Sequence, residues 1–251
     1  MTERGTGMDT DLYLRVREKE GRLYSDEEVA QLPSVSNAHP ISMEWRARAA
    51  SAARLTGYLS RRSKPLSILD LGCGNGWLSN LLHRSGHCVI GLDQNHFELK
   101  QAARVFSQQK GLSFLEADVF LSPFVAETFD AILLASVIQY FRDLPVLLSA
   151  LLRYLKGQGE IHIIDSPLYS DSERDQAANR SLQYYASLGF PQMAEHYFHH
   201  RASDLSTFRR KTLYQGRPLT LRLNQLLGRF DSPFPWMVIQ KQDVTQDAVN
   251  S

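Results

Sequence analysis

The sequence predicts an α/β fold with a doubly wound, mostly parallel sheet, and three observations support this prediction. From Ser67 onward, short apolar runs alternate with segments of helical length and pattern. A turn with three glycines in five residues directly follows the first apolar run. Two further strand-like runs occur near the end of the chain. Such alternation implies right-handed crossovers between parallel strands.

The elements of the alternating part are expected in a regular order. Strands are expected at Ser67–Leu71, Cys88–Leu92, Ser113–Glu116, Ala131–Ala135 and Glu160–Ile164. The helices between them are expected at Trp77–Arg84, His96–Gln109 and Leu144–Leu155, with Gly111 and Gly157 where helices stop. After Asp165 the alternation ends. The remaining elements are expected to be helices over Asp171–Leu188 and around Leu221–Leu227, and strands at Lys211–Gln215 and Trp236–Lys241.

The chain before the alternating part reads as helical. Ser25 and Glu28 fit a capping box, and a long helix is expected from Ser42 to Ser60. We therefore expect four parts: an N-terminal helical cap (1–64), a ligand-binding core (65–168 and 208–243), an inserted lid on the substrate side (169–207) and a disordered tail (244–251).

Composition excludes several classes of protein. The chain has 251 residues, 43% of them hydrophobic, so it can bury a sizeable core. Its net charge of +1 gives no field that would attract a nucleic acid or a membrane surface. The longest apolar run, Ala131 to Ile138, is too short to cross a bilayer, and the polar first residues are no secretory signal. Two cysteines give neither a disulfide framework nor a zinc motif, so a cytoplasmic protein is expected.

The stretch ILDLGCGNGWLS (Ile68 to Ser79) reads as a strand, a glycine turn and a helix. Because glycine has no side chain, such a turn brings backbone close to a ligand. A plain reversal of the chain would use the same residues. Acidic residues in and after the strands distinguish the two interpretations.

Three acidic residues fall in or just after consecutive strands. Asp93 lies 17 residues after Gly76, where a carboxylate can bind both hydroxyls of an adenosine ribose. Asp118 can accept from an adenine amino group, with Val119 offering apolar contact. Each acid also has a plainer interpretation: Asp70 as a tie within the glycine loop, Asp93 as an N-cap, Asp118 as an ordinary loop acid. Together they describe an adenosine pocket.

The spacing of the glycines narrows the choice of adenosine ligand. The pattern is G-x-G-x-G, and Trp77 stands where the third glycine of a dinucleotide fingerprint would be expected. A nicotinamide-dependent oxidoreductase is therefore disfavoured. No Lys-Ser or Lys-Thr pair follows, so the turn is not a nucleotide-binding P-loop.

Five segments together resemble class I S-adenosylmethionine-dependent methyltransferases. ILDLGCGNGWLS resembles the first motif of that family, GLDQN (91–95) the second, EADVF (116–120) the third, FDAILLASVIQYF (129–141) the fourth, and LKGQGEIHIID (155–165) the turn and fifth strand. The resemblance spans about Pro65 to Pro167. It implies a Rossmann-like methyltransferase fold with a seven-stranded sheet, an antiparallel last strand and helical lid additions.

The resemblance also implies S-adenosylmethionine as cofactor and a set of residues around it. The three glycines would pass beneath its amino-acid part, Asp93 would hold the ribose, and Ala135 and Ser136 would line the methionine side with backbone groups. Cys73 is interpreted as a small filler rather than a nucleophile. The expected cofactor-binding residues are Arg48, Asp70, Gly72, Cys73, Gly74, Asn75, Gly76, Asp93, Gln94, Asp118, Val119, Ala135 and Ser136.

The expected activity is methyl transfer to an oxygen or nitrogen of a small organic molecule. The alternatives are an RNA or protein methyltransferase with the same core, or a cofactor-binding module without activity. ASVIQY replaces the Asn-Pro-Pro-aromatic segment of adenine-amino methyltransferases, and neither cysteine is placed for cytosine-carbon methylation. Asp165 could bind a metal, but it has no evident partner carboxylates, so no metal is expected. The oligomeric state is left open.

The segments outside the core supply candidate residues for the substrate side. Arg48 lies on the otherwise apolar face of its helix, and would pair either with the cofactor carboxylate or with a core acid such as Asp70. The stretch HYFHHR (196–201) suits a pocket wall or a proton acceptor, or a plain exposed turn. The catalytic candidates are His199, His200 and Tyr140, and the substrate candidates are His39, Tyr140, Tyr184, His196 and His200.

Overall fold

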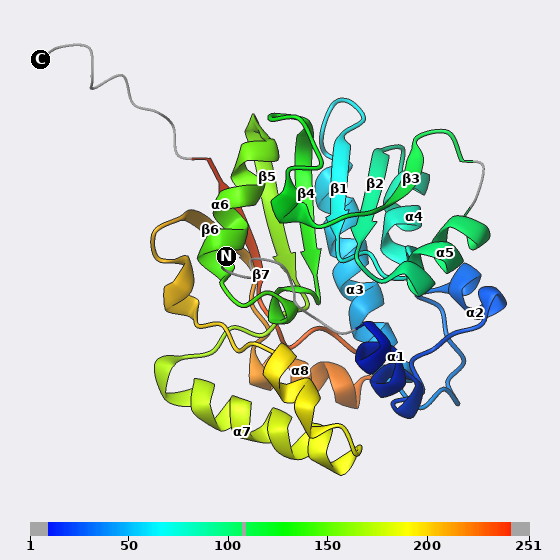
Figure 1. Cartoon of the computed structure of the whole chain (residues 1–251), viewed down its shortest axis with the longest axis vertical. Coiled ribbons are helices and arrows are strands. Elements are labelled where there is room, and N and C mark those ends of the chain that lie inside the picture. Colours follow the sequence, from blue (N-terminus) through cyan, green and yellow to red (C-terminus); the bar gives the residue numbers. More distant parts are fainter. Residues whose placement is uncertain (1–9, 107–108, 242–251) are drawn as a thin grey trace, which may run out of the picture.

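A seven-stranded sheet forms the centre of the protein (Figure 1). The structure is a computed structural model that describes residues 10–106 and 109–241. The expected tail, 244–251, lies outside the described residues. The strand order is β3-β2-β1-β4-β5-β7-β6. The strands are β1 (Ser67–Leu71), β2 (Cys88–Asp93), β3 (Leu112–Glu116), β4 (Phe129–Ala135), β5 (Leu155–Ile164), β6 (Arg209–Tyr214) and β7 (Trp236–Gln240).

All pairs from β3 to β5 are parallel, and β7 runs antiparallel to both β5 and β6. The predicted doubly wound sheet with an antiparallel last strand is therefore confirmed. Strands β2 and β3 are added on one side of β1, and β4 and β5 on the other, so the strand order reverses between β1 and β4. In open α/β sheets, ligands bind beyond the carboxyl ends of the strands at such a reversal.

Helices cover the sheet and extend beyond its carboxyl edge (Figure 1). They are α1 (Thr10–Lys19), α2 (Asp26–Gln31), α3 (Ser42–Leu59), α4 (Trp77–Arg84), α5 (His96–Val105), α6 (Leu144–Tyr154), α7 (Asp171–Ser187) and α8 (Pro218–Leu226). Four short 3-10 helices are η1 (Val119–Leu121), η2 (Ile138–Tyr140), η3 (Pro191–His196) and η4 (Ala202–Leu205). Ser25 and Glu28 form the expected capping box at the start of α2. No helix in the described ranges combines the length and apolar character that a bilayer crossing requires.

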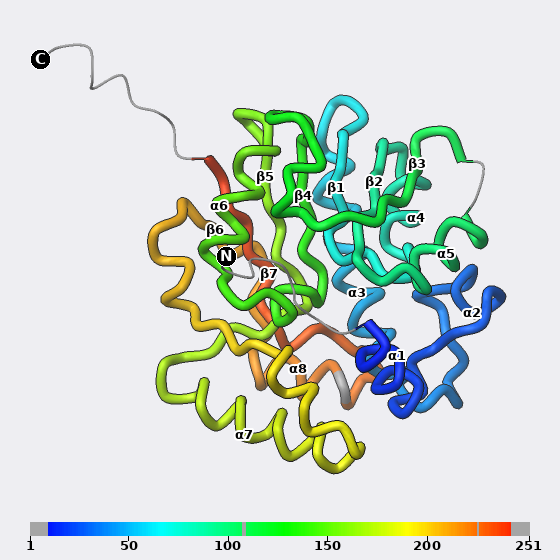
Figure 2. Tube along the Cα trace, in the orientation of Figure 1, coloured from blue at the N-terminus to red at the C-terminus, as the bar shows by residue number. Residues whose placement is uncertain are grey.

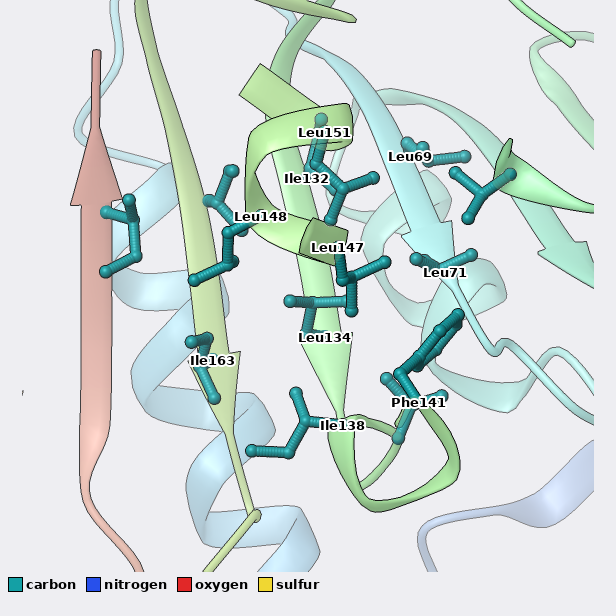
Figure 3. Packing of buried hydrophobic residues seen from close by; sticks show 14 of the residues in the cluster. Leu69, Leu71, Ile132, Leu134, Ile138, Phe141, Leu147, Leu148, Leu151 and Ile163 are labelled. Atoms are coloured by element: carbon teal, nitrogen blue, oxygen red, sulfur yellow. The ribbon is translucent and has the colours of Figure 1, made fainter. Parts of the chain in front are cut away.

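Apolar side chains alternate between the two faces of the sheet and build one core on each side. On one face, leucines of α6 pack against β1, β4 and β5 (Figure 3). On the other face, Ala52, Leu55 and Leu59 of α3 pack with Ile68 and Leu133. Helix α3 therefore belongs to the packed core layer. The packing of α3 against the sheet crosses the proposed boundary at residue 64. That boundary stays a prediction.

The expectation that Gly157 stops a helix is wrong. Helix α6 ends at Tyr154 and β5 begins at the next residue, so Gly157 lies within the strand. A register shift between Phe129 and Ala131 accommodates this extended start of β5 beside β4. A strand beginning without an intervening loop leaves no glycine-dependent turn to recognise in the sequence.

Two segments that are far apart in the sequence meet beyond the carboxyl edge of the sheet. Figure 2 shows α1 and α7 on this same side of the molecule. Leu12 and Val16 of α1 are buried in a separate cluster with Tyr185 of α7 and Met193 of η3. Because this cluster is apart from the two sheet cores, it joins the N-terminal helix to the inserted segment.

Candidate active site

The glycine loop after β1 is held in a shape that requires glycine. Gly72, Gly74 and Gly76 have φ values of 72°, 51° and 76°. An added Cβ at Gly72 would lie 2.1 Å from Cγ2 of Val137, and one at Gly76 would lie 2.6 Å from the Phe114 ring. The backbone amide of Gly72 donates to Leu92 O at 2.7 Å, which ties the loop to β2. Both the left-handed backbone and the close neighbours exclude a side chain.

Asp93, at the end of β2, organises the loops on either side of it. One carboxylate oxygen accepts from the Gly74 amide at 2.8 Å, and the other accepts from the amides of Gln94 and Asn95 at 2.8 and 2.9 Å. Burial raises the pKa of Asp93, while these three amides oppose the rise. The interpretation of this residue as an N-cap is wrong, since Asn95 caps α5.

These loops form one side of a cavity, here called the glycine-loop cavity. Eleven of the predicted site residues line it: Arg48, Gly72, Cys73, Gly74, Asn75, Asp93, Gln94, Val119, Ala135, Ser136 and Tyr140. They come from the carboxyl ends of β1, β2 and β4, from η1 and η2, and from α3. The cavity therefore lies at the reversal of strand order, where such folds bind ligands.

Helix α1 closes the opposite side of the glycine-loop cavity. Tyr13 and Arg17, one turn apart, both line it, and Arg17 Nε donates to the Tyr13 hydroxyl at 2.9 Å. Glu98 lines the cavity from α5. Burial, together with the neighbouring charge of Asp93, raises the pKa of Glu98 to about 7. The cavity thus carries two carboxyl groups facing a cation from α1.

A chain of ion pairs crosses the rim of this cavity. Arg48 Nη2 lies 2.6 Å from Glu44 Oε1, and Arg22 binds the same carboxylate with two bonds of 2.8 and 2.7 Å. These two arginines hold the pKa of Glu44 near 2 against the effect of burial. Arg48 also lies over the Trp45 ring at 5.0 Å. Its ion-pair partner is Glu44, so the alternative of a pair with Asp70 is wrong.

A larger cavity, here called the outer cavity, adjoins the first and has a volume of about 780 Å³. Arg17, Arg22, Arg48, Ser136 and Tyr140 line both. Its other walls come from α3, α7 and α8, from the segment after α8, and from Tyr169 and Tyr197. They include Ala177, Arg180, Ser181, Tyr184, Tyr185, Leu221, Arg229, Phe230 and Phe234. This volume is within the range of cavities that enclose small organic molecules.

Two strained residues stand where the cavities meet the sheet. Ser136 and Asp165 have φ values of 54° and 50°, in the left-handed region that non-glycine residues rarely adopt. They follow β4 and β5, and Ser136 Oγ donates to the Asp165 carbonyl at 3.0 Å. The Asp165 carboxylate accepts from Ser51 Oγ at 2.7 Å and lines the outer cavity. Strain of this kind concentrates at functional sites.

Three expected cofactor residues do not line the glycine-loop cavity. Asp70 is buried and accepts from Ser79 Oγ at 2.6 Å. It therefore connects β1 to α4, and no described bond joins it to the glycine loop. Gly76 is the N-cap of α4. Asp118 caps η1 by accepting from the Phe120 amide at 2.8 Å, which leaves the neighbouring Val119 facing the cavity.

The histidines expected near the substrate line neither cavity. His200 is buried, with Nε2 2.8 Å from Ile138 O, and burial lowers its pKa. His199 Nε2 lies 2.9 Å from Ser181 Oγ, and His196 ends η3. His39 stacks on Tyr24 at 5.8 Å. In contrast, Tyr140 lines both cavities and Tyr184 the outer one.

Cys73 is buried, and this raises its thiol pKa well above the ordinary value. Its sulfur fills the space above Gly91, where an added Cβ would lie 2.8 Å away. Both observations agree with a filler that stays a thiol. Within the described residues, no group of three or more His, Cys, Asp or Glu side chains could hold a metal ion.

Several lining residues are not predicted from the sequence. Tyr13, Arg17 and Glu98 of the first cavity, and Tyr169 of the second, are not singled out by a motif or pattern in the sequence. Tyr197 lies in the stretch HYFHHR, for which a pocket wall is one expected role, and it lines the outer cavity. The only signal for α1 is helical periodicity, since Leu12 and Val16 are four residues apart and both buried. Periodicity finds the buried face but does not indicate that the adjacent face covers a cavity.

Comparison with known proteins identifies the central part of the chain. Residues 69–163 match the family described as "Methyltransferase domain". A malonyl-[acyl-carrier protein] O-methyltransferase from Erwinia pyrifoliae is 31% identical over 102 residues, which cover 41% of this chain and 38% of that protein. A ubiquinone biosynthesis O-methyltransferase from Bartonella bacilliformis is 35% identical over 102 residues, 39% of this chain and 40% of that protein. The chain thus spans about two fifths of the length of these relatives.

The fold extends beyond the matched segment. Geranyl diphosphate C-methyltransferase from Streptomyces coelicolor A3(2) superposes with a TM-score of 0.59 at 16% identity, covering 93% of this chain and 98% of that one. Its crystal structure contains Mg²⁺, geranyl diphosphate and S-adenosyl-L-homocysteine. The matched domain, the strand order and the glycine loop agree with one another. Residues 69–163 are therefore similar to a methyltransferase domain, and the fold around them is the one seen in the geranyl diphosphate C-methyltransferase.

Proposed function

We propose that this protein transfers the methyl group of S-adenosylmethionine to an oxygen or nitrogen of a small organic molecule. The observation that carries the proposal is the junction of the two cavities, because the glycine-loop cavity opens into an aromatic-walled space at Ser136 and Tyr140. A cofactor in the first cavity and an acceptor in the second would meet there. A concave space of this size with aromatic walls favours a small acceptor over RNA or protein.

The residues of the glycine-loop cavity fit S-adenosylmethionine. The loop around Gly72 leaves no room for a Cβ, so its backbone can approach the amino-acid part of the cofactor. The partly buried Asp93 carboxylate lines the cavity as an acceptor for ribose hydroxyls, and Val119 offers an apolar surface for adenine. Arg48, on the rim, is placed to add a bond to the cofactor carboxylate while keeping Glu44.

The bound cofactor would supply an electrophilic methyl group on a sulfonium, and the chain would supply position and electrostatics. Tyr140, on the junction, would orient the acceptor. Asp165 lines the outer cavity with a carboxyl whose pKa burial raises, so it is a candidate to accept a proton from an acceptor hydroxyl. The three histidines 196, 199 and 200 would act only as supports, because they line neither cavity.

The names of the relatives agree with a small acceptor but differ in the atom methylated. Two are O-methyltransferases, and the structural neighbour is a C-methyltransferase. The test is incubation of the purified protein with methyl-labelled S-adenosylmethionine and a metabolite extract, with the label followed by mass spectrometry. Label in a small metabolite supports the proposal. Label only in RNA or protein favours the second candidate, and cofactor binding without any transfer favours a binding module.

A further inference from the structure

The acidic side chains of the outer cavity already have bonding partners within the protein. Glu20 accepts from the Tyr184 hydroxyl at 2.7 Å and lies 3.2 Å from both Arg17 and Arg22. Asp231 is paired with Arg54 at 2.6 Å. Glu44 holds Arg22 and Arg48, and Asp165 accepts from Ser51. Three of these four carboxylates are therefore paired with arginines, and Asp165 is the one whose hydrogen-bond partner in the described part of the chain is a hydroxyl.

Two arginines that line the same cavity, in contrast, have no ion-pair partner in the described part of the chain. Arg180 from α7 and Arg229 from the segment after α8 both line the outer cavity, and both are exposed to it. Among the residues that the structure describes, neither has a side-chain hydrogen bond or an ion pair. The Arg180 charge acts on the Tyr169 hydroxyl, opposing the rise of its pKa that burial causes. Arg180 therefore lies near Tyr169 without a direct ion pair to a described residue, and its charge also acts on the Glu173 carboxylate one turn or more away on α7.

The tyrosines add unpaired donors to this positive charge. Tyr169, Tyr185 and Tyr197 line the outer cavity, and their hydroxyls form no hydrogen bond to a described residue. Burial raises the pKa of each, so all three stay protonated at neutral pH and can donate. Their rings form an apolar wall, in which the ring centroids of Tyr185 and Tyr197 lie 5.9 Å apart and the ring planes are tilted by 59°. Such a wall suits the flat body of an aromatic molecule.

The positions of these groups indicate how an acceptor would be oriented across the two cavities. Ser136 and Tyr140 line both cavities, whereas Arg180 and Arg229 line only the outer one. Methyl transfer at the junction would place the reacting atom beside Ser136 and Tyr140. An anionic group elsewhere on the same molecule would then be away from this junction, in the part of the outer cavity that the two arginines line.

We propose, on the basis of the methyl-transfer function above, that the acceptor is an aromatic acid. Its carboxylate or phosphate group binds Arg180 and Arg229, and its ring lies against the wall that the tyrosines form. Arginine binds both anions with paired N–H donors, so the two groups share this chemistry. The nucleophilic oxygen or nitrogen is at the opposite end of the molecule from the acid.

The test is equilibrium binding to the full chain saturated with S-adenosylhomocysteine. The probes are a panel of hydroxybenzoates, aminobenzoates and aryl phosphate monoesters, each paired with its neutral amide or alcohol, and titrations follow binding. We expect at least one anionic probe to bind tenfold or more tightly than its neutral partner. The carboxylate and phosphate arms show which anion is preferred.

Variants assign that preference to the two arginines. Arg180→Gln and Arg229→Gln should each weaken binding of the anionic probe by roughly tenfold or more, since a charged hydrogen bond contributes about 1.5–3 kcal/mol. Binding of S-adenosylhomocysteine should not change. Arg174→Gln is the matched control on α7, because Arg174 does not line the cavity, and it should leave both affinities unchanged.

Two results would overturn the inference: neutral probes that bind as well as their acids, or anion binding that survives both arginine substitutions. Failure of every anionic probe to bind the complex would count equally against it. A protein that does not bind S-adenosylhomocysteine would instead contradict the proposed function. The two failures are therefore distinguishable in one set of titrations.

Discussion

The two cavities adjoin, but they differ in how far apart in the sequence their lining residues lie. The glycine-loop cavity takes most of its wall from three strand ends and the residues directly after them. The outer cavity is lined by residues of α1, α3, α7 and the segment after α8, which meet only in the folded chain. Backbone geometry fixes the first, and side-chain packing between distant segments fixes the second. Cofactor residues can therefore share a motif across a family while acceptor residues vary with the added helices.

The largest effect is expected from Gly72→Ala, which tests whether backbone geometry fixes the first cavity. The new Cβ would lie 2.1 Å from Val137 Cγ2 at a φ of +72°. Left-handed strain costs about 1–2 kcal/mol and overpacking about 1–3 kcal/mol, so unfolding in urea should show a loss of about 2–5 kcal/mol. Gly57→Ala is the control, since no atom lies within 4 Å of its Cβ. It should stabilise helix α3 by about 0.5–1 kcal/mol. Equal effects at the two glycines would refute the role of backbone geometry.

Asp93→Asn should weaken S-adenosylhomocysteine binding by about a hundredfold, or about 2.7 kcal/mol. The amide keeps the shape but presents only one acceptor oxygen, whereas the carboxylate accepts three backbone amides and is proposed to bind ribose hydroxyls. Stability should also fall, because one loop amide loses its acceptor. Calorimetric titration checks the affinity. Unchanged affinity would remove Asp93 from the cofactor site and leave it as a loop support.

The pH dependence of stability tests the buried carboxyl of Glu98. Its pKa in the folded state is about 7, above the ordinary 4.5, so the folded state binds the proton more tightly than the unfolded state. Stability should therefore fall as pH rises from about 4.5 to about 7, by up to about 3 kcal/mol from this group. Glu98→Gln should remove that part of the slope. His162, with a pKa lowered to about 4, acts with the opposite sign but is present in both proteins. Parallel curves for the two proteins would contradict the assignment.

Arg48→Gln is expected to have the smallest effect, because the rim contains a second arginine on Glu44. Cofactor affinity should fall about tenfold through loss of a charged hydrogen bond to its carboxylate. Fold stability should change little, since a partly exposed pair such as Arg48 with Glu44 contributes about 1 kcal/mol or less. Thermal unfolding with and without S-adenosylhomocysteine separates the two effects. A variant that loses stability but binds the cofactor normally would assign Arg48 a structural role only.

The sequence predicts the sheet and the glycine-loop cavity because both depend on local patterns. Strand β1 and helix α4 match their expected bounds, since the buried run ends directly at a glycine turn. Val119 and Ser136 line the cavity as the family motifs imply. Asp70 and Asp118 are placed in the right loops, but side-chain direction decides their contacts, and they bond to Ser79 and Phe120 instead.

The outer cavity could not be predicted to the same extent. Its residues are contributed by α1, α7 and the segment after α8, and which faces meet depends on packing such as that of Val16 with Tyr185. The histidines at 196, 199 and 200 are expected near the substrate because of their chemistry, yet none of them lines either cavity. Composition identifies chemically able residues, whereas only the fold determines which of them face a ligand.

The central claim is that the glycine-loop cavity binds S-adenosylmethionine and its product. The most direct test is a calorimetric titration of the unmodified chain with S-adenosylhomocysteine, and with NAD as an adenosine ligand of another class. We expect saturable binding of one S-adenosylhomocysteine per chain and no heat of binding for NAD, because Trp77 occupies the position of the third glycine of a dinucleotide site. Binding of NAD without binding of S-adenosylhomocysteine would contradict the claim.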